Sequence, residues 1–150
     1  MTSRAAELVR DLALAPHPEG GHYRELYRSA ARLPGGRAAC THIHFLLAAG
    51  EKSRWHRVDA DELWQLAEGG PLELLRTDGP HLVRIVLDRP GALGAVPPGE
   101  WQAARPLGDY ALVGCTVAPG FEFSGFRMLA DDAVESACFR RDHPDVADLI

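Results

Sequence analysis

The chain has 150 residues, the usual size of one domain, and it is long enough to bury a sizeable core without disulfides or bound metals. Its net charge of −5 argues against a general nucleic-acid binder, which needs a basic surface to neutralise phosphates. Its three cysteines are odd in number and form no CxxC pair, which argues against a zinc knuckle and a disulfide framework.

The first predicted element is a helix near the N-terminus. The apolar residues of "TSRAAELVRDLAL" recur at helical spacing, and Pro16 and Pro18 end the helix because proline cannot continue it. This stretch lacks the apolar core and cleavage site of a signal peptide, and no apolar run approaches the ~20 residues of a membrane span. We therefore expect a cytoplasmic protein that does not enter membranes.

Short strands separated by turns follow along most of the chain. Stretches such as "HYRELYRSA", "ACTHIHFLLA" and "DYALVGCTV" alternate with turn sequences such as "LPGG", "TDGP" and "VPPGE". About nine strands without intervening helices are typical of an all-β sandwich or barrel. Residues 131–150 lose the strand pattern, so we expect a short helical segment at the C-terminus of a single domain that spans residues 1–150.

One pair of strands carries the side chains of most functional interest. If the turn "DAD" preserves the strand register, five side chains share one face: His56, Val58, Glu62, Trp64 and Leu66. A face that combines tryptophan and leucine with histidine and glutamate is not a simple solvent face. It predicts the lining of a pocket.

The spacing of these residues resembles the first motif of the cupins. That motif reads Gly, five residues, His-x-His, three or four residues, Glu, six residues, Gly. Gly50, His56, Glu62 and Gly69 stand at the matching positions, and Val58 replaces the second histidine. In the second motif (Gly, five residues, Pro-x-Gly, two residues, His), the similar stretch "GALGAVPPGEWQ" has glutamine at the histidine position.

The resemblance extends beyond the motifs, over about residues 12–128. It is similar to one cupin subfamily, the small, single-domain, largely uncharacterised RmlC-like cupins of the Cupin_5 type. The subfamily patterns "P-H-P-E-G-G-x-Y-x-E", "S-x-W-H-R-V-x-x-D-E-x-W" and "L-V-G-C-T-V-A-P-G-F-x-F" stand here at residues 16–25, 53–64 and 112–123. Members often have tyrosine where this chain has His44, and histidine where it has Gln65.

The resemblance implies a double-stranded β-helix, the cupin jelly-roll barrel, with a pocket inside and a homodimer formed by strand exchange near the N-terminus. By motif position it implies that His56, Glu62 and Gln102 hold a divalent metal ion. Imidazole and carboxylate suit Mn, Fe, Ni or Zn, and the loss of two histidines shifts the preference toward a hard ion such as Mn²⁺. The alternative is a metal-free polar pocket in which His56 hydrogen bonds to Glu62.

A glutamate outside the motifs is a further catalytic candidate. Glu25 shares a strand face with Tyr23, a candidate for ligand contact, and the resemblance places this strand beside the barrel mouth. With His56, Glu25 could act as a general acid or base. The alternative is an edge-strand charge that discourages aggregation.

Large aromatic residues border both motifs and a later turn. Trp55, Trp64, Trp101 and Phe121 could give rigid contact area to a small-molecule ligand. The alternative is that they pack the core of a small barrel. Core packing is favoured for the three tryptophans, whereas Phe121 is expected to close either the pocket or the dimer interface.

The remaining histidines favour structural roles. His42 and His44 lie two residues apart on one strand face and could mimic a His-x-His metal pair, but the subfamily has ordinary residues there. His17, beside the turn "PEGG", is expected to satisfy local hydrogen bonds, and Glu19 is expected to lie beside the barrel mouth. No His–Asp dyad can be placed in this sequence.

These residues support three hypotheses of function. The first is a metal-dependent isomerase, epimerase or lyase that abstracts a proton next to the carbonyl of a small polar, sugar-like metabolite. The second is a non-catalytic cupin that binds a small ligand. A metal-dependent dioxygenase is disfavoured, because oxygen activation at iron relies on at least two histidines plus a carboxylate, and the motifs provide only His56.

Overall fold

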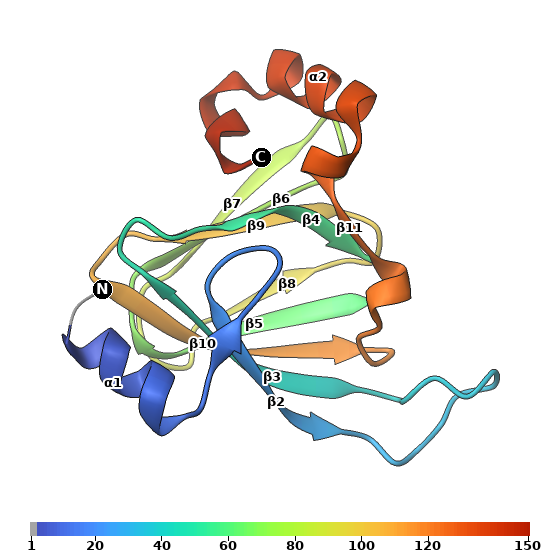
Figure 1. Ribbon diagram of the computed structural model, residues 1–150. Helices are drawn as coiled ribbons and strands as arrows, with labels where there is room; N and C mark the ends of the chain where they lie inside the picture. The colour runs from blue at the N-terminus through green and yellow to red at the C-terminus, as the bar shows by residue number, and fades with distance from the viewer. Residues whose placement is uncertain (1–2) are drawn as a thin grey trace.

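The computed structural model describes residues 3–150, and its strands form two antiparallel sheets that face each other (Figure 1). The larger sheet has the order β1-β2-β3-β10-β5-β8, with bounds β1 Ala15–Pro16, β2 His22–Arg28, β3 Thr41–Ala48, β10 Tyr110–Ala118, β5 Asp61–Gly69 and β8 Leu93–Val96. The smaller sheet has the order β11-β4-β9-β6-β7, with bounds β11 Phe126–Met128, β4 Ser53–Val58, β9 Trp101–Pro106, β6 Leu72–Thr77 and β7 Leu82–Leu87. The predicted all-β jelly-roll barrel is confirmed.

Helices lie at the two ends of the chain, as predicted. They are α1 Ser3–Asp11, α2 Ala133–Asp142 and the short 3-10 helices η1 Phe123–Gly125, η2 Leu129–Asp131 and η3 Pro144–Leu149. In α1, Ala5 and Leu8 are buried against Leu46 and Leu112 on the outer face of the larger sheet. Within residues 3–150, no helix is long and apolar enough to cross a membrane.

Strands β4 and β5 are consecutive in the chain but belong to opposite sheets. Only Asp59 and Ala60 separate them. The alternation within β5 buries Glu62 and exposes its neighbours, and His56 on β4 is buried as well. The predicted common face is therefore the barrel interior, and His56 and Glu62 approach it from opposite sheets.

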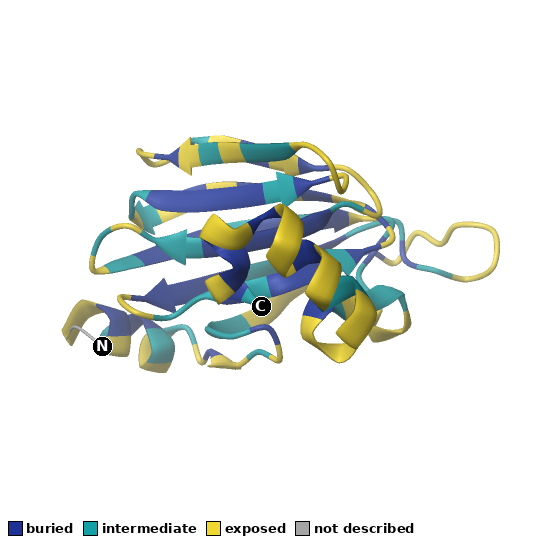
Figure 2. Ribbon diagram, turned by 90° about the horizontal axis from the view of Figure 1, so that it is seen from above, coloured by how far each residue is buried: buried dark blue, intermediate teal, exposed yellow. Residues whose placement is uncertain are grey.

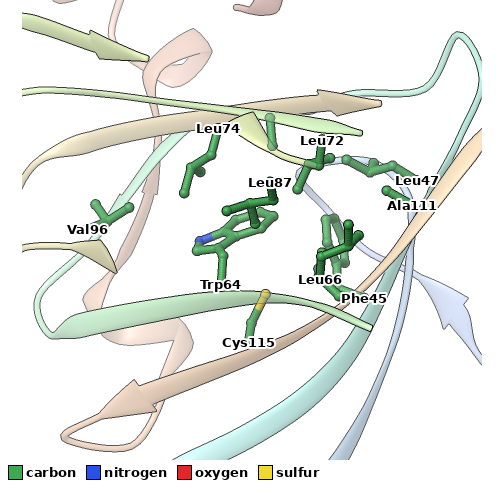
Figure 3. Packing of buried hydrophobic residues seen from close by; sticks show 12 residues of the cluster. Phe45, Leu47, Trp64, Leu66, Leu72, Leu74, Leu87, Val96, Ala111 and Cys115 are labelled. Atoms are coloured by element: carbon green, nitrogen blue, oxygen red, sulfur yellow. The ribbon is translucent and has the colours of Figure 1, made fainter. Parts of the chain in front are cut away.

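The interior core is apolar along most of its length. Figure 3 shows Phe45, Trp64, Leu66 and Leu74 reaching into it from both sheets. The rings of Phe45 and Trp64 meet edge to face, with centroids 5.7 Å apart. Each fully buried leucine stabilises the fold by roughly 1.5–3 kcal/mol. Along β5 the inward side chains change from leucine through tryptophan to Glu62, so the apolar core ends where a polar group begins.

A second core covers the outer face of the smaller sheet. Figure 1 places α2 and the C-terminus over this sheet, and Figure 2 shows α2 turning its exposed face away from buried strand residues. Trp55 and Trp101 pack there against Phe139 and Val146. The indole N–H of Trp55 donates to the carbonyl of Val146 at 2.9 Å, which fixes the C-terminal segment to β4.

Candidate functional site

The imidazole of His56 is held in one orientation and one tautomer. Its side chain is 1% exposed, and its Nδ1 lies 2.7 Å from the carbonyl oxygen of Arg54. Because a carbonyl can only accept a hydrogen bond, Nδ1 carries the hydrogen. The other ring nitrogen, Nε2, therefore presents a lone pair when the ring is neutral.

The group facing that lone pair is the carboxyl of Glu19. Its Oε2 lies 3.2 Å from Nε2 of His56, and its Oε1 accepts a hydrogen bond from Oγ of Ser53 at 2.8 Å. Glu19 comes from the turn between β1 and β2, and that turn is pressed against the start of β4. A Cβ at Gly20, where φ is +116°, would overlap the carbonyl oxygen of Lys52, so only glycine allows this approach.

Burial favours the neutral forms of both groups. It raises the pKa of Glu19 to about 8, against the opposing effects of the Ser53 hydrogen bond and the Arg54 charge. It also lowers the pKa of His56, although Glu62 and the Arg54 carbonyl act in the other direction. In these forms, the protonated carboxyl of Glu19 faces the Nε2 lone pair of neutral His56 at 3.2 Å.

A second carboxyl group, that of Glu62, is oriented by a chain of hydrogen bonds. The amide nitrogen of Gln102 donates to its Oε2 at 2.8 Å, and Nε1 of Trp64 donates to the amide oxygen of Gln102 at 2.8 Å. An indole nitrogen can only donate, so Trp64 fixes which way the amide points. Burial raises the pKa of Glu62 to about 7; the nearby His56 lowers it and Glu19 raises it.

The predicted metal ligands do not fit a metal ion in this arrangement. The amide oxygen of Gln102, the atom that would bind the ion, is engaged by Trp64, and the amide nitrogen points at Glu62. Turning the amide to free the oxygen would break both hydrogen bonds. In residues 3–150, no group of three or more His, Cys, Asp and Glu side chains is arranged to hold a metal ion. The donor set therefore does not support the Mn²⁺, Fe, Ni or Zn ion expected from the motif.

Aromatic rings cover the Glu19–His56 pair. The ring centre of Phe126 lies 5.5 Å from that of His56, and the ring of His17 lies 6.0 Å from Phe126 and 4.5 Å from Tyr23. The Nδ1 of His17 accepts a hydrogen bond from the backbone N–H of Glu19 at 3.2 Å. Burial, together with the nearby His56, lowers the pKa of His17 to about 4, so this ring is neutral near pH 7.

An open hollow of about 440 Å³ lies on the other side of this aromatic layer. Three of its lining residues were predicted to serve the site: Tyr23, Glu25 and Phe121. Glu25 is ion-paired with Arg28 at 2.7 Å on the rim of the hollow. The ring of Tyr23 contacts His17, so one side chain separates the hollow from the buried carboxyl of Glu19.

The structure thus divides the predicted site residues into three places. His56, Glu62, Gln102 and Trp64 meet in the barrel interior, whereas Tyr23, Glu25 and Phe121 meet in the hollow. Trp55 and Trp101 lie on the opposite side of their strands, in the outer core under α2. There the Arg57 guanidinium stacks on Trp101 at 4.6 Å and lies 3.8 Å from Glu135, so these residues hold the C-terminal segment.

The sequence did not predict that two residues of the turn between β1 and β2, His17 and Glu19, contribute to the interior site. His17 was expected to satisfy local hydrogen bonds, and it does bond the backbone of Glu19, but its ring also covers the buried pair. Glu19 was not assigned to the site, and no His–Asp dyad was placed; the structure supplies a His–Glu pair. The available signal was the run "HPEGG", whose glycines let a loop approach the barrel closely.

Comparison with known proteins agrees with the fold. The family described as Cupin superfamily (DUF985), Cupin_5, matches residues 6–129. A hypothetical protein from Leishmania major is 28% identical, with a TM-score of 0.80 over 97% of this chain and 96% of its own. A protein from Shewanella oneidensis is 30% identical, with a TM-score of 0.82 over 97% of this chain and 93% of its own. No curated protein matches the sequence.

More distant structures share the architecture alone. Oxalate decarboxylase from Bacillus subtilis is 15% identical, with a TM-score of 0.64 over 90% of this chain and 36% of its own. KdgF from a Halomonas species is 16% identical, with a TM-score of 0.53 over 71% of this chain and 86% of its own. Their identity is too low to carry an activity across. Family match, sheet topology and motif positions agree, and the chain belongs to the Cupin_5 family of the cupin superfamily.

Proposed function

We propose that this cupin moves a proton next to the carbonyl group of a small polar metabolite, in an isomerisation, an epimerisation or a lyase step. The observation that supports this most strongly is the buried pair of Glu19 and His56, with Glu62 reaching the same interior from the opposite sheet. Carboxyl groups whose pKa lies near neutrality are suited to act as a general acid or base. Two such groups near one imidazole provide both partners of a proton transfer.

The hydrogen bonds suggest a role for each group. Gln102 donates to Oε2 of Glu62, and no described residue donates to its Oε1, so the ionised carboxylate can take a proton from carbon. The electron pair of that C–H bond then moves toward the carbonyl oxygen. Glu19 gives its proton to that oxygen beside His56. Glu62 then gives its proton to the neighbouring carbon, while Glu19 takes a proton back from the oxygen on that carbon, which completes an isomerisation.

The hollow beside the aromatic layer supplies a place for the metabolite to dock. Its volume of about 440 Å³ suits a small molecule. We propose that Tyr23 and Phe121 contact its apolar parts, and that Glu25 and Arg28 on the rim bind its polar groups. Phe123, which is 55% exposed, moves aside to let the reacting carbon enter the interior and reach Glu62.

A non-catalytic ligand-binding cupin is the second candidate. The observation that favours it is the closure of the interior, since His56 is 1% exposed and Glu62 is 7% exposed. In this case the interior hydrogen bonds would only stabilise the packing of the barrel core, and the hollow alone would bind the ligand. A metal-dependent reaction has less support, because Gln102 does not offer its oxygen to an ion.

Solvent exchange separates the two candidates. The protein is incubated in D₂O with ketoses, aldoses and keto acids, and deuterium incorporation is followed by NMR while binding is measured by calorimetry. We expect incorporation with at least one compound class, and a loss of 10²–10⁴-fold in His56→Gln and Glu62→Gln. A surface variant, Glu7→Gln, is the matched control. Binding without exchange across the panel would leave the ligand-binding cupin as the function.

We also propose that two chains pair through the open part of β2. One edge of β2 pairs with β3, and β1 pairs with the other edge only at His22 and Tyr23. No described strand covers the rest of that second edge. Leu26 and Tyr27 are 47% and 56% exposed on this stretch. An uncovered edge with apolar side chains supports the strand exchange expected from the family resemblance.

A further inference from the structure

A second group of polar side chains lies outside the barrel, on the outer face of the larger sheet. Strands β3, β10 and β5 are neighbours there (Figure 1). In their register, His44 and Gln65 are both Cα partners of Gly114, one on each side. Because the residue between them has no side chain, the imidazole of His44 and the amide of Gln65 border the same space. These are also the two positions at which the sequence departs from the subfamily pattern.

His42 leans into this space from the same strand as His44. Its Nδ1 lies 2.8 Å from Oγ1 of Thr116, which orients the ring. A Cβ at Gly114 would lie 2.8 Å from Cε1 and 3.0 Å from Nε2 of His42, so the ring occupies the room that the glycine leaves. Its Nε2 makes no hydrogen bond with the described residues and is free to bind a ligand.

His44 has a nitrogen that lacks a partner. Its Nδ1 is buried and makes no hydrogen bond within residues 3–150, which is an unfavourable state for a buried polar atom. The rings of His42 and His44 have centroids 6.5 Å apart at 71°. Burial, then the neighbouring His42 and Arg24, lower the pKa of His44, so this imidazole is neutral near pH 7. A neutral imidazole is the form that binds metal ions.

Gln65 offers an oxygen to the same space. Its amide nitrogen donates weakly to the carbonyl of Gly91 at 3.4 Å, which leaves Oε1 without a donor among the described residues. His42, His44, Gln65 and Gly114 line one hollow of about 310 Å³. The hollow is open to solvent and large enough for an ion with bound water.

We propose that His42, His44 and Gln65 form a surface site for a borderline divalent metal ion such as Cu²⁺, Ni²⁺ or Zn²⁺. Imidazole nitrogen suits these ions, and a three-residue site leaves a position for water. Metal–nitrogen bonds of about 2.0–2.1 Å would place the two ring centres about 5 Å apart, so the rings approach by about 1.5 Å on binding. No described residue makes a hydrogen bond with the side chain of His44 that would oppose this movement. The site is separate from the barrel interior and independent of the function proposed for it.

The test uses the full chain without a polyhistidine tag, stripped of metal and titrated with Cu²⁺, Ni²⁺ and Zn²⁺ by calorimetry. We expect one Cu²⁺ per chain, with electron paramagnetic resonance showing coupling to two imidazole nitrogens. His42→Ala and His44→Ala each weaken binding at least tenfold, because loss of a direct ligand costs no less than the roughly 10–100-fold effect typical of supporting residues. Gln65→Ala has a smaller effect.

Two controls keep the proposal falsifiable. His81, which is exposed and lies 3.1 Å from Asp78, is replaced by alanine and is expected to leave the Cu²⁺ affinity unchanged. His56→Gln tests the barrel interior and is also expected to bind as the wild type does. Failure to bind any of the three ions, or equal affinity in His42→Ala, His44→Ala and the wild type, would overturn the site. Circular dichroism of each variant verifies that the fold is retained.

Discussion

The carboxyl group of Glu19 lies 3.2 Å from Nε2 of His56, and it reaches this imidazole on β4 from the turn between β1 and β2. The contact depends on a glycine that lets the turn approach β4 and on an Arg54 carbonyl that fixes the tautomer of His56. Both partners are buried, so each polar atom that loses its partner is left without water to replace it.

Replacement of Glu19 separates its structural from its chemical role. Glu19→Gln keeps a donor for His56 and an acceptor for Ser53, so we expect a change in the free energy of unfolding within about 1 kcal/mol. Glu19→Ala leaves Nε2 and the Ser53 hydroxyl unpaired and should destabilise the protein by about 2–4 kcal/mol more. Urea unfolding measures both values. Equal stability of the two variants would contradict a stabilising contact between Glu19 and His56.

Stability should fall as the pH rises from 6.5 to 8. Glu19, with its pKa raised to about 8, keeps its proton in the folded state, whereas the unfolded carboxyl has already lost it above about 4.5. The unfolded state binds fewer protons in this window, so rising pH favours unfolding, by up to about 2 kcal/mol. Urea midpoints at several pH values measure the slope, and Glu19→Gln should reduce it.

His17 contributes a slope of the opposite sign at lower pH. The pKa of His17 is lowered to about 4 in the folded state, so between pH 4 and 6.5 the unfolded state binds more protons at this residue. His17 therefore destabilises the fold as the pH falls from 6.5 toward 4, while the two buried carboxyls act in the reverse sense. His17→Phe should remove this contribution and keep a ring against Tyr23, so between pH 6.5 and 4 the variant should become more stable relative to the wild type as the pH falls. If the free energy of unfolding of this variant depends on pH below 6.5 as that of the wild type does, another group controls this dependence.

The three tryptophans should respond differently to substitution. Trp64→Phe removes the N–H that orients Gln102, so we expect impaired proton exchange together with a stability loss of about 1–3 kcal/mol. Trp55→Phe removes the hydrogen bond to Val146 on the outer face and should lower stability alone, by a similar amount. Deuterium exchange and urea unfolding of both variants provide the comparison. Loss of exchange in Trp55→Phe would argue that the outer core controls the interior site.

Treatment with a chelator should leave the interior chemistry intact. The amide oxygen of Gln102 is already bonded to Trp64, so proton exchange by the dialysed protein is expected to match that of the untreated protein. Metal analysis accompanies the assay, since the surface histidines can release an ion without affecting exchange. Restoration of a lost activity by added Mn²⁺ would support a metal in the barrel instead.

The pairing of two chains can be tested at Tyr27. Sedimentation of the wild type should give twice the monomer mass of 16.3 kDa, and Tyr27→Asp should shift the equilibrium toward the monomer. Val134, 77% exposed on α2, offers a matched control as Val134→Asp. A monomeric wild type would exclude the proposed pairing.

Alternation along the strands made the interior predictable. The period of two placed His56 and Glu62 on one face, and the apolar neighbours Trp64 and Leu66 identified that face as a lining. The same period put Trp55 on the opposite side, but it could not reveal that a C-terminal helix covers that side. Which surface a helix covers depends on long-range packing, and the weak amphipathic pattern of residues 133–142 gave no direction.

The contribution of Glu19 could not be predicted for a different reason. It lies in an irregular turn, where no periodicity relates sequence position to the direction of a side chain. Its inward orientation follows from the close approach of Gly20 to Lys52, a contact between segments that are distant in sequence. The metal prediction failed to find support for a similar reason, because motif spacing identified Gln102 but not the partner that engages its oxygen.

The length of the two-residue link between β4 and β5 determines which side chains of β5 face the barrel interior. Because these strands belong to opposite sheets, Asp59 and Ala60 set at once which way Glu62 points and how the two walls of the barrel are tied together. One inserted residue would turn every inward side chain of β5 outward and bring its polar neighbours into the core. Loops at a protein surface usually tolerate changes of length, but this one does not have that freedom.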